Sequence, residues 1–174
     1  MTIELLVEPL RRVALFQGLQ PAQLNEIARR SERIQFKAGD TVISEGQPAD
    51  AAILIVTGTA KRTEGPSIGD DTFGPGMLLG EMAMLVETEY SSTVVCVEPI
   101  RALKITRERL LEQMSSDISL ADHFVAQLSG RLRQLAAEFR KISEVLEPAP
   151  QPKRRMRAPA QLAFDPSAQQ TAMH

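Results

Sequence analysis

The chain has 174 residues and a formal net charge of −2, so as a whole it is no polyanion-binding protein. Its hydrophobic content of 43% and charged content of 24% are ordinary for a globular protein and allow one domain with a full core plus an appendage. The single cysteine, Cys96, excludes a disulfide framework and a cysteine-ligated metal or iron–sulfur cluster of the usual kind. No run approaches the roughly 18 apolar residues of a membrane span, and no signal peptide is recognisable, so a cytoplasmic location is expected.

Helices are expected in the first 33 residues. Apolar residues recur at roughly helical spacing over residues 3–16, and Pro9 is expected to break or to start an element there. The segment Gly18-Leu19-Gln20-Pro21 predicts a turn whose proline opens a second helix. We therefore predict a first segment of N-terminal helices, residues 1–33.

From Ile34 the pattern changes to short runs in which apolar and polar residues alternate. Turn residues such as Gly39 and Gly58 separate these runs, at a spacing of about eight to twelve residues. Such spacing is typical of an antiparallel roll or barrel, which we predict over residues 34–105. The last run, residues 100–105, alternates as a half-buried edge strand would.

The part of this region that carries ligand-binding features is residues 69–99. It begins as a glycine-rich turn, and glycine lets a backbone approach a ligand closely. A short helical turn after Gly80 can point free N–H groups at a phosphate, and the carboxylate of Glu81 can accept a hydrogen bond from a hydroxyl. The segment is therefore predicted to be an anion cradle.

This segment resembles the phosphate-binding cassette of cyclic-nucleotide-binding domains, because Gly80, Glu81, Ala83 and Ser91 fall on matching positions. The resemblance runs from about Leu15 through the C-terminal helix and points to the catabolite-activator (Crp/Fnr-like) superfamily. It implies an α+β fold, an antiparallel β-roll of the jelly-roll type flanked by N-terminal helices and a long C-terminal dimerisation helix. In that family the Glu holds the ribose 2′-hydroxyl, the Gly and Ala backbone surrounds the cyclic phosphate, and an Arg neutralises it. The ligand-binding set implied here is Gly80, Glu81, Met82, Ala83, Tyr90 and Ser91.

The chain departs from the family pattern at Tyr90, which stands where the family carries its Arg. An unpaired phosphate charge moved out of water costs several kcal/mol, and Tyr supplies only one neutral donor. The nearest basic residues in the sequence, Arg62 and Arg101, lie outside the cassette. We therefore expect weak or absent binding of cAMP and cGMP; the alternative is a genuine sensor of a cyclic nucleotide or of another small ligand.

Residues 106–147 are expected to form C-terminal helices, the first of them capped by Thr106. Apolar residues along the second helix are spaced alternately four and three residues apart, a heptad seam that predicts a dimerisation helix. The predicted dimer interface consists of Val125, Leu128, Leu132, Leu135, Phe139, Ile142 and Leu146. The alternative is a helix that packs only on its own domain. Relatives cover the bound base from this helix, usually with polar side chains, whereas Leu135-Ala136-Ala137 occupies that region here.

The composition changes again after Glu147. Residues 148–174 are rich in proline and basic, and we expect a disordered tail. Such a tail cannot supply the winged helix-turn-helix with which transcription factors of this superfamily read DNA, so sequence-specific DNA binding is not expected. Its four basic residues, Lys153, Arg154, Arg155 and Arg157, could contact nucleic acid, anionic lipid or an acidic protein surface.

No catalytic or metal site is expected, because His123 and His174 are the only histidines and no nucleophile–base pair can be assembled. Two functions fit the remaining signals. One is a regulatory module that senses a ligand and signals to a partner protein, and the other is a relative with a degenerate pocket that serves as a dimeric adaptor. Tyr90 favours the second. We therefore predict a non-enzymatic homodimeric regulatory module that requires no cofactor and acts through a protein partner that the sequence does not identify.

Overall fold

The computed structural model describes the backbone of residues 3–66 and 71–146 and the side chains of residues 6–66 and 71–141. The predicted tail, residues 148–174, and the first two residues of the cassette segment lie outside the described residues. The chain forms two units, Met1–Gln134 and Leu135–His174, and the first contains the whole roll. In the described part of the chain no helix is long and apolar enough to cross a membrane.

The N-terminal part is helical, as the spacing predicts. It consists of α1 (Ile3–Arg12), η1 (Ala14–Phe16) and α2 (Pro21–Arg30). Pro9 does not break or start an element, since α1 continues through it. A proline inside a helix removes one backbone hydrogen bond, and the burial of Leu6 and Leu10 on either side of it offsets this loss.

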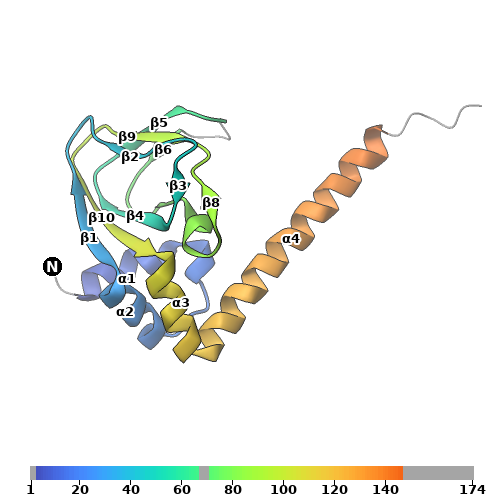
Figure 1. Cartoon of the computed structure of the whole chain (residues 1–174), viewed down its shortest axis with the longest axis horizontal. Coiled ribbons are helices and arrows are strands. Elements are labelled where there is room, and N and C mark those ends of the chain that lie inside the picture. The colour runs from blue at the N-terminus through green and yellow to red at the C-terminus, as the bar shows by residue number, and fades with distance from the viewer. Residues whose placement is uncertain (1–2, 67–70, 147–174) are drawn as a thin grey trace, which may run out of the picture. The chain divides into compact units, whose positions relative to one another are not determined.

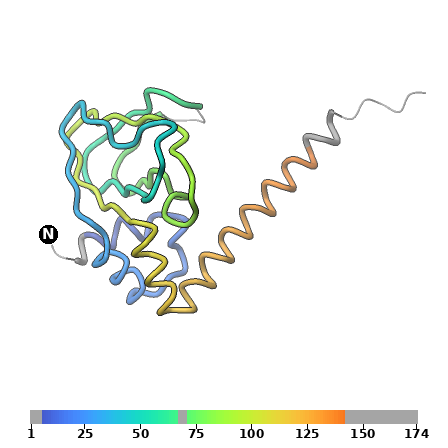
Figure 2. The backbone as a smooth tube through the Cα atoms, in the orientation of Figure 1, coloured from blue at the N-terminus to red at the C-terminus, as the bar shows by residue number. Residues whose placement is uncertain are grey.

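Ten short strands follow in residues 32–66 and 71–106, all paired antiparallel, which confirms the predicted α+β fold with its β-roll. Figure 2 traces their path through the roll. One four-stranded sheet has the order β1-β10-β4-β7, a second has the order β2-β9-β5-β6, and β3 pairs with β8. The strands are β1 (Glu32–Phe36), β2 (Thr41–Ile43), β3 (Pro48–Ala49), β4 (Ala51–Thr57), β5 (Ala60–Glu64), β6 (Thr72–Phe73), β7 (Leu78–Leu79), β8 (Thr88–Glu89), β9 (Thr93–Cys96) and β10 (Ile100–Thr106).

The expectation of an edge strand at residues 100–105 is wrong. β10 lies between β1 and β4, so that Ala102 is paired with Ile34 on one side and with Ile55 on the other. Alternation along a strand reports which face of the sheet is covered. It does not report the place of the strand in the sheet, because that place depends on hydrogen-bond partners from distant segments.

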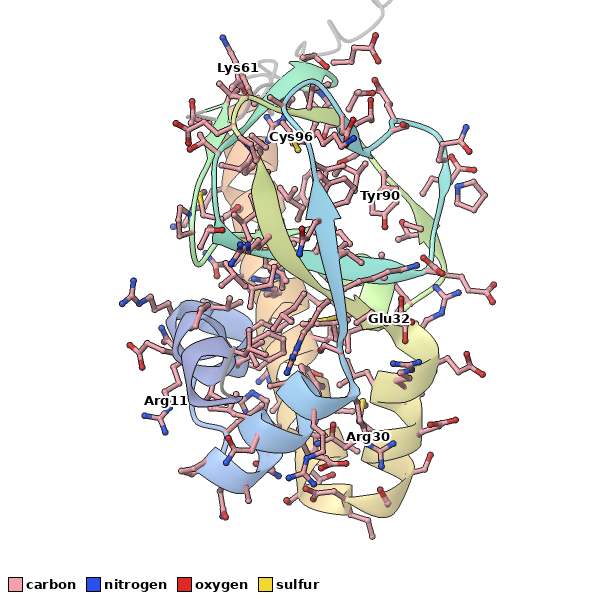
Figure 3. All side chains as sticks on the ribbon, turned by 90° about the vertical axis from the view of Figure 1, so that its left-hand side faces the viewer. Arg11, Arg30, Glu32, Lys61, Tyr90 and Cys96 are labelled. Carbon is pink, nitrogen blue, oxygen red and sulfur yellow. The ribbon has the colours of Figure 1, made fainter. Side chains whose placement is uncertain are left out.

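Two apolar cores hold the roll and its helices together. The first joins α1, α2 and the start of α4 to one face of the sheet, with Phe16 and Phe124 in an edge-to-face contact at 6.1 Å between ring centroids. The second lies inside the roll and includes Ile55, Val94 and Cys96. Cys96 is therefore a buried core residue, and burial raises the pKa of its thiol. Figure 3 shows Cys96 and Tyr90 among the strands, and Arg11 and Arg30 on the helices.

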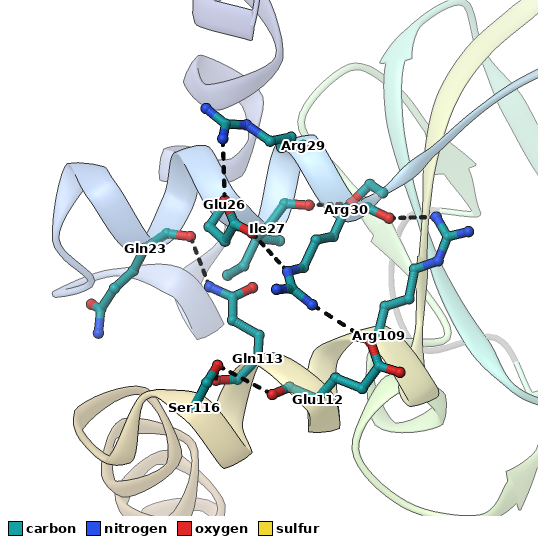
Figure 4. A network of polar contacts seen from close by, with 10 residues as sticks. Gln23, Glu26, Ile27, Arg29, Arg30, Arg109, Glu112, Gln113 and Ser116 are labelled. Atoms are coloured by element: carbon teal, nitrogen blue, oxygen red, sulfur yellow. Dashed lines mark hydrogen bonds and ion pairs between the residues drawn. The ribbon is translucent and has the colours of Figure 1, made fainter.

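Helix α3 (Arg107–Ser116) packs beside α2 through a polar network (Figure 4). The side chain of Gln113 donates to the carbonyl of Gln23 at 3.3 Å, and the Arg30 guanidinium pairs with both Glu26 and Glu112. Arg109 adds a hydrogen bond of 2.7 Å to the backbone carbonyl of Arg30. The helices below the roll in Figure 1 are thus tied to one another by polar contacts as well as by the first core.

Helix α4 (Ile118–Leu146) begins at a capping aspartate rather than at a run of good helix formers. Asp117 accepts hydrogen bonds from the backbone N–H of Leu120 at 3.1 Å and from the hydroxyl of Ser119 at 2.6 Å. Its second oxygen accepts from the amide of Gln23 at 2.9 Å, which ties the start of α4 to α2. Thr106, which the sequence predicts to cap α3, precedes that helix but makes no capping hydrogen bond.

Candidate functional site

The centre of the site is the tight turn at Gly80. β7 ends at Leu79, and Gly80 then takes a left-handed conformation, φ 64° and ψ 38°, at the start of the 3₁₀ helix η2 (Glu81–Met84). Glycine adopts this region without the cost that a Cβ atom brings. The N–H of Ala83 donates to the Gly80 carbonyl at 2.9 Å and closes the turn. The residues that the cassette pattern singled out therefore form one compact turn.

Tyr90 lies beside this turn, in the connection between β8 and β9. Its hydroxyl donates to the backbone carbonyl of Ala51, on β4, at 2.9 Å, and its ring packs against Gly80. The backbone N–H of Tyr90 donates a hydrogen bond to the carbonyl of Gln47, and the backbone carbonyl of Tyr90 accepts one from the N–H of Gly46. Burial, and next the negative charge of Asp50, raise the pKa of the Tyr90 phenol above its ordinary value of 10.0. Tyr90 is thus a neutral side chain whose one donor is already used.

A cavity of about 340 Å³ opens next to Tyr90. This volume is at the small end of the range of about 300 to 1,000 Å³ that is usual for ligand pockets. All the ligand-binding residues predicted from the sequence line this cavity. Gly80 and Tyr90 are ten positions apart in the chain, so the fold of the roll is needed to bring them to the same cavity. The lining is Ile43, Arg62, Phe73, Leu78, Leu79, Gly80, Glu81, Met82, Ala83, Thr88, Glu89, Tyr90, Ser91 and Ser92.

The structure adds one cation to this lining that the cassette does not contain. Arg62 on β5 reaches the cavity wall with its guanidinium carbon 5.3 Å from the centroid of the Phe73 ring. Its Nη1 is hydrogen-bonded to a carboxylate oxygen of Asp71 at 3.2 Å and to the carbonyl of Pro66 at 2.7 Å. Arg101, the other basic residue near the cassette in sequence, is exposed on β10 and lines no part of the cavity.

Glu81 faces a partner from the same chain. Arg131 on α4 donates to both carboxylate oxygens of Glu81, with its Nη2 at 3.2 Å from Oε2. These hydrogen bonds raise the pKa of the Arg131 guanidinium. Sequence reasoning assigns the carboxylate to a ligand hydroxyl and misses this pair, because the two residues are 50 positions apart. A ligand hydroxyl that reached Glu81 would have to share it with Arg131.

Arg107, at the start of α3, is hydrogen-bonded to backbone carbonyls of the cassette turn and of a neighbouring segment. Its Nη1 donates to the carbonyls of Val86 at 2.8 Å, Ala49 at 3.2 Å and Ala83 at 3.4 Å. A guanidinium that gathers several carbonyls fixes loops that lack regular backbone pairing. Nothing in the local sequence signals this role, since the three acceptors belong to two distant segments.

The predicted dimer seam lies along α4. Val125, Leu132, Leu135 and Phe139 expose half or more of their surface, and Leu132 is the most exposed at 68%. Leu128 is only half-buried. The side chains of Ile142 and Leu146 lie outside the described residues. The seam is thus apolar and open to solvent where the structure describes it.

The structure assigns His123 a packing role. One of its ring nitrogens lies 2.9 Å from the carbonyl oxygen of Leu15, and the ring stacks edge-on against Phe124. Within residues 6–66 and 71–141, no three His, Cys, Asp or Glu side chains come together in a way that could hold a metal ion.

Comparison with known proteins places these features in a family. The family model "Cyclic nucleotide-binding domain" matches residues 33–117. A CRP-like cAMP-activated global transcriptional regulator from Mycobacterium tuberculosis is 24% identical over 131 residues, which are 73% of this chain and 58% of that protein. This chain therefore spans less than two thirds of the length of that relative.

Solved structures agree with this placement. A cyclic nucleotide-binding-like protein from Brucella abortus is 33% identical, with a TM-score of 0.56, over 63% of this chain and 97% of that one. The sensor domain of the transcriptional regulator DNR from Pseudomonas aeruginosa is 26% identical, with a TM-score of 0.60, over 78% of this chain and 94% of that one. The roll and the cassette turn of this chain, together with these matches, show that the chain belongs to the cyclic nucleotide-binding domain family and is related to CRP-like regulators.

Proposed function

We propose that this chain is a non-enzymatic, dimeric regulatory module whose pocket binds cAMP and cGMP weakly or not at all. The observation that carries this proposal is the place of Tyr90. Its ring packs on Gly80 and its hydroxyl is bonded to Ala51, so the cassette offers a cyclic phosphate neither a cation nor a free phenol donor.

Arg62 and Arg131 support the same conclusion, because each of these cations near the cavity already has a carboxylate partner. Arg62 is paired with Asp71, and Arg131 is paired with Glu81. A phosphate that recruited either cation would leave a carboxylate without its partner. A buried phosphate that lacks the charge-assisted pair with the family's Arg forfeits about 3 to 5 kcal/mol, which corresponds to hundreds- to thousands-fold in affinity.

The regulatory role rests on α4. This helix carries the open apolar seam, and its Arg131 is bonded directly to the cassette turn. A change at the turn would therefore act on the same helix that we propose pairs two copies of the chain. We propose that the dimer passes this change to a protein partner.

A second candidate is a genuine ligand sensor, and the open cavity of about 340 Å³ favours it. One relative is named as a cAMP-activated regulator, and Glu81 and Ser91 of this chain match the cassette pattern. In this candidate the cavity would bind a ligand without an Arg at position 90.

Calorimetric titration with cAMP and cGMP separates the two candidates. We expect no tight binding by the wild type and a gain in affinity by Tyr90→Arg, which restores the cation. Tyr90→Phe is the matched control, since it keeps the ring and adds no charge, and it should not gain affinity. Tight binding of either nucleotide by the wild type would overturn the proposal in favour of the sensor.

A further inference from the structure

We propose that the cavity beside Tyr90 binds a small molecule with a flat apolar body and an acceptor oxygen, from a carbonyl or a carboxylate, that the guanidinium of Arg62 holds. This inference rests on the proposed function and names the ligand class of its pocket. It is carried by an arginine that the fold turns into the roll and that keeps one buried N–H group without a partner.

The fold directs Arg62 into the roll. Arg62 on β5 lies directly opposite Val94 on β9, and Val94 is buried in the second core. Residues that face each other across an antiparallel pair project from the same side of the sheet. The Arg62 side chain is accordingly only 16% exposed, and it forms part of the cavity wall. Because arginine is rarely buried unless it is paired, its donors need partners here.

The partners within the chain satisfy only part of this guanidinium. Asp71 and the carbonyl of Pro66 both accept from Nη1 of Arg62, at 3.2 and 2.7 Å. Nε of Arg62 is buried as well, and it has no hydrogen-bond partner in the part of the chain that the structure describes. A buried donor without a partner is costly, and a charged one is more costly than a neutral one. An acceptor that a ligand brings to Nε would remove this cost.

Such an acceptor adds to the ion pair of Arg62 and does not replace it. Asp71 is bonded to Nη1, whereas Nε is a separate donor of the same planar group. The acceptor therefore comes to Arg62 on β5, where the guanidinium already lies. A cyclic phosphate is expected at the cassette turn around Gly80 instead, and it would have to draw Arg62 away from Asp71.

The rest of the wall favours a flat apolar body. The guanidinium carbon of Arg62 lies over the ring of Phe73, 5.3 Å from its centroid. Tyr90 donates its hydroxyl to Ala51, so it offers the cavity mainly its ring. The aliphatic lining residues are Ile43, Leu78, Leu79 and Ala83. A small planar molecule fits these surfaces and a cavity of about 340 Å³.

The test compares probes that share a phenyl ring and differ in the acceptor. Acetophenone brings a neutral carbonyl and benzoate brings a carboxylate. Ethylbenzene brings no acceptor, and benzylamine, which is protonated at neutral pH, brings only donors. Binding to the full chain is followed by NMR at the Nε–H group of Arg62. The chain has one tyrosine and no tryptophan, so the fluorescence of Tyr90 gives an independent signal from the cavity wall.

We expect acetophenone and benzoate each to bind at least about tenfold more tightly than ethylbenzene and benzylamine, a typical gain for a hydrogen bond to a charged group. Both acceptor probes should shift the Nε–H resonance of Arg62 downfield, because that proton gains a hydrogen bond. The tighter of the two identifies the acceptor group that the site prefers. This readout uses the wild type and does not depend on the folding of any variant.

Arg62→Lys is the variant that isolates the Nε–H group. Lysine keeps a positive charge for Asp71 but lacks the planar fork of donors, so the tenfold preference for the acceptor probes should disappear. If the charge alone attracted the ligand, benzoate would keep its advantage in this variant. Arg101→Lys is the matched control, because Arg101 is exposed and lines no part of the cavity, and it should leave the preference unchanged.

The inference is overturned if ethylbenzene binds as tightly as acetophenone, if neither acceptor probe binds, or if they bind without a shift at Arg62. An unchanged preference in Arg62→Lys would overturn it as well. Failure of the proposed function has a different signature, which is tight cAMP binding by the wild type. That result can occur together with a selective response of Arg62 to the acceptor probes, so the two failures are distinguishable.

Discussion

The ring of Tyr90 fills the space that a side chain at Gly80 would need. A Cβ atom built on Gly80 would lie 2.6 Å from Cε1 and 3.1 Å from Cδ1 of Tyr90. Gly80 also has a φ of 64°, in the left-handed region that L side chains rarely adopt. The two residues are therefore fitted to each other: with the Tyr90 ring in place, position 80 has no room for a side chain.

Gly80→Ala should therefore destabilise the protein through two separate effects. Strain at positive φ costs about 1 to 2 kcal/mol, and the overpacking against Tyr90 adds about 1 to 3 kcal/mol. Gly39→Ala is the matched control, because Gly39 has a φ of 88° but nothing within 4 Å of its Cβ position. Urea denaturation should show the larger loss for Gly80→Ala, and Tyr90→Ala in the same chain should recover the difference. Equal losses in the two alanine variants would show that the contact with Tyr90 is unimportant.

The ion pair of Arg131 with Glu81 should contribute measurable but modest stability. Their side chains are 40% and 34% exposed, so solvent and salt screen the attraction. We expect a double-mutant cycle with Arg131→Gln and Glu81→Gln to give a coupling free energy of about 0.5 to 1 kcal/mol that decreases at high salt.

A second cycle provides the control for this pair. Arg12 and Glu8 form a single contact of 3.6 Å between side chains that are 66% and 60% exposed, and their coupling should be close to zero. If the two cycles gave the same coupling, the contact between α4 and the cassette turn would have no energetic weight. The role that we propose for Arg131 in regulation would then lose its support.

The location of the cassette is predictable from the sequence because its residues are close together in the chain. Gly80 and Glu81 are adjacent, and the tight turn at Gly80 follows from local backbone preference. The repeated short strands likewise predict a β-roll, because strand period and turn residues are local signals.

The partners of these side chains are not predictable in the same way. The acceptor for the Tyr90 hydroxyl is 39 residues away, and the cation on Glu81 is 50 residues away. Arg62 enters the cavity wall because β5 pairs with β9, and no local pattern specifies that pairing. The electrostatic character of the pocket is therefore a property of the tertiary structure, whereas its backbone shape is already present in the sequence.

The cap of α4 should make the stability of the protein depend on pH in the acidic range. The hydrogen bond from Ser119, then that from Gln23, lower the pKa of the Asp117 carboxyl below its ordinary value of 3.8. A pKa that is lower in the folded state means that the stabilisation is present above the unfolded value and is lost as the pH falls through the folded value.

Asp117→Asn tests this linkage, because asparagine still accepts a hydrogen bond as an N-cap but carries no charge. The variant should be less stable than the wild type at neutral pH. The difference between their denaturation midpoints should begin to shrink as the pH falls below 3.8, where the carboxyl of the unfolded wild type is protonated, and should disappear below the lower folded-state pKa. A difference that stayed constant with pH would rule out the carboxylate charge as the source of the effect.

The seam of α4 gives the sharpest prediction about assembly. Leu132 is 68% exposed and Phe139 is 66% exposed, and the two lie on the same side of the helix. An open apolar stripe with heptad spacing is stabilised when a second helix covers it. We therefore expect light scattering to find a dimer at micromolar concentration. Leu132→Asp should dissociate this dimer, because the introduced carboxylates would be buried in the interface without partners.

Ala137→Asp is the control, because it places the same charge on the opposite side of the helix and should leave the dimer intact. A monomeric wild type, or a dimer that survives Leu132→Asp, would show that the seam does not pair two copies of the chain.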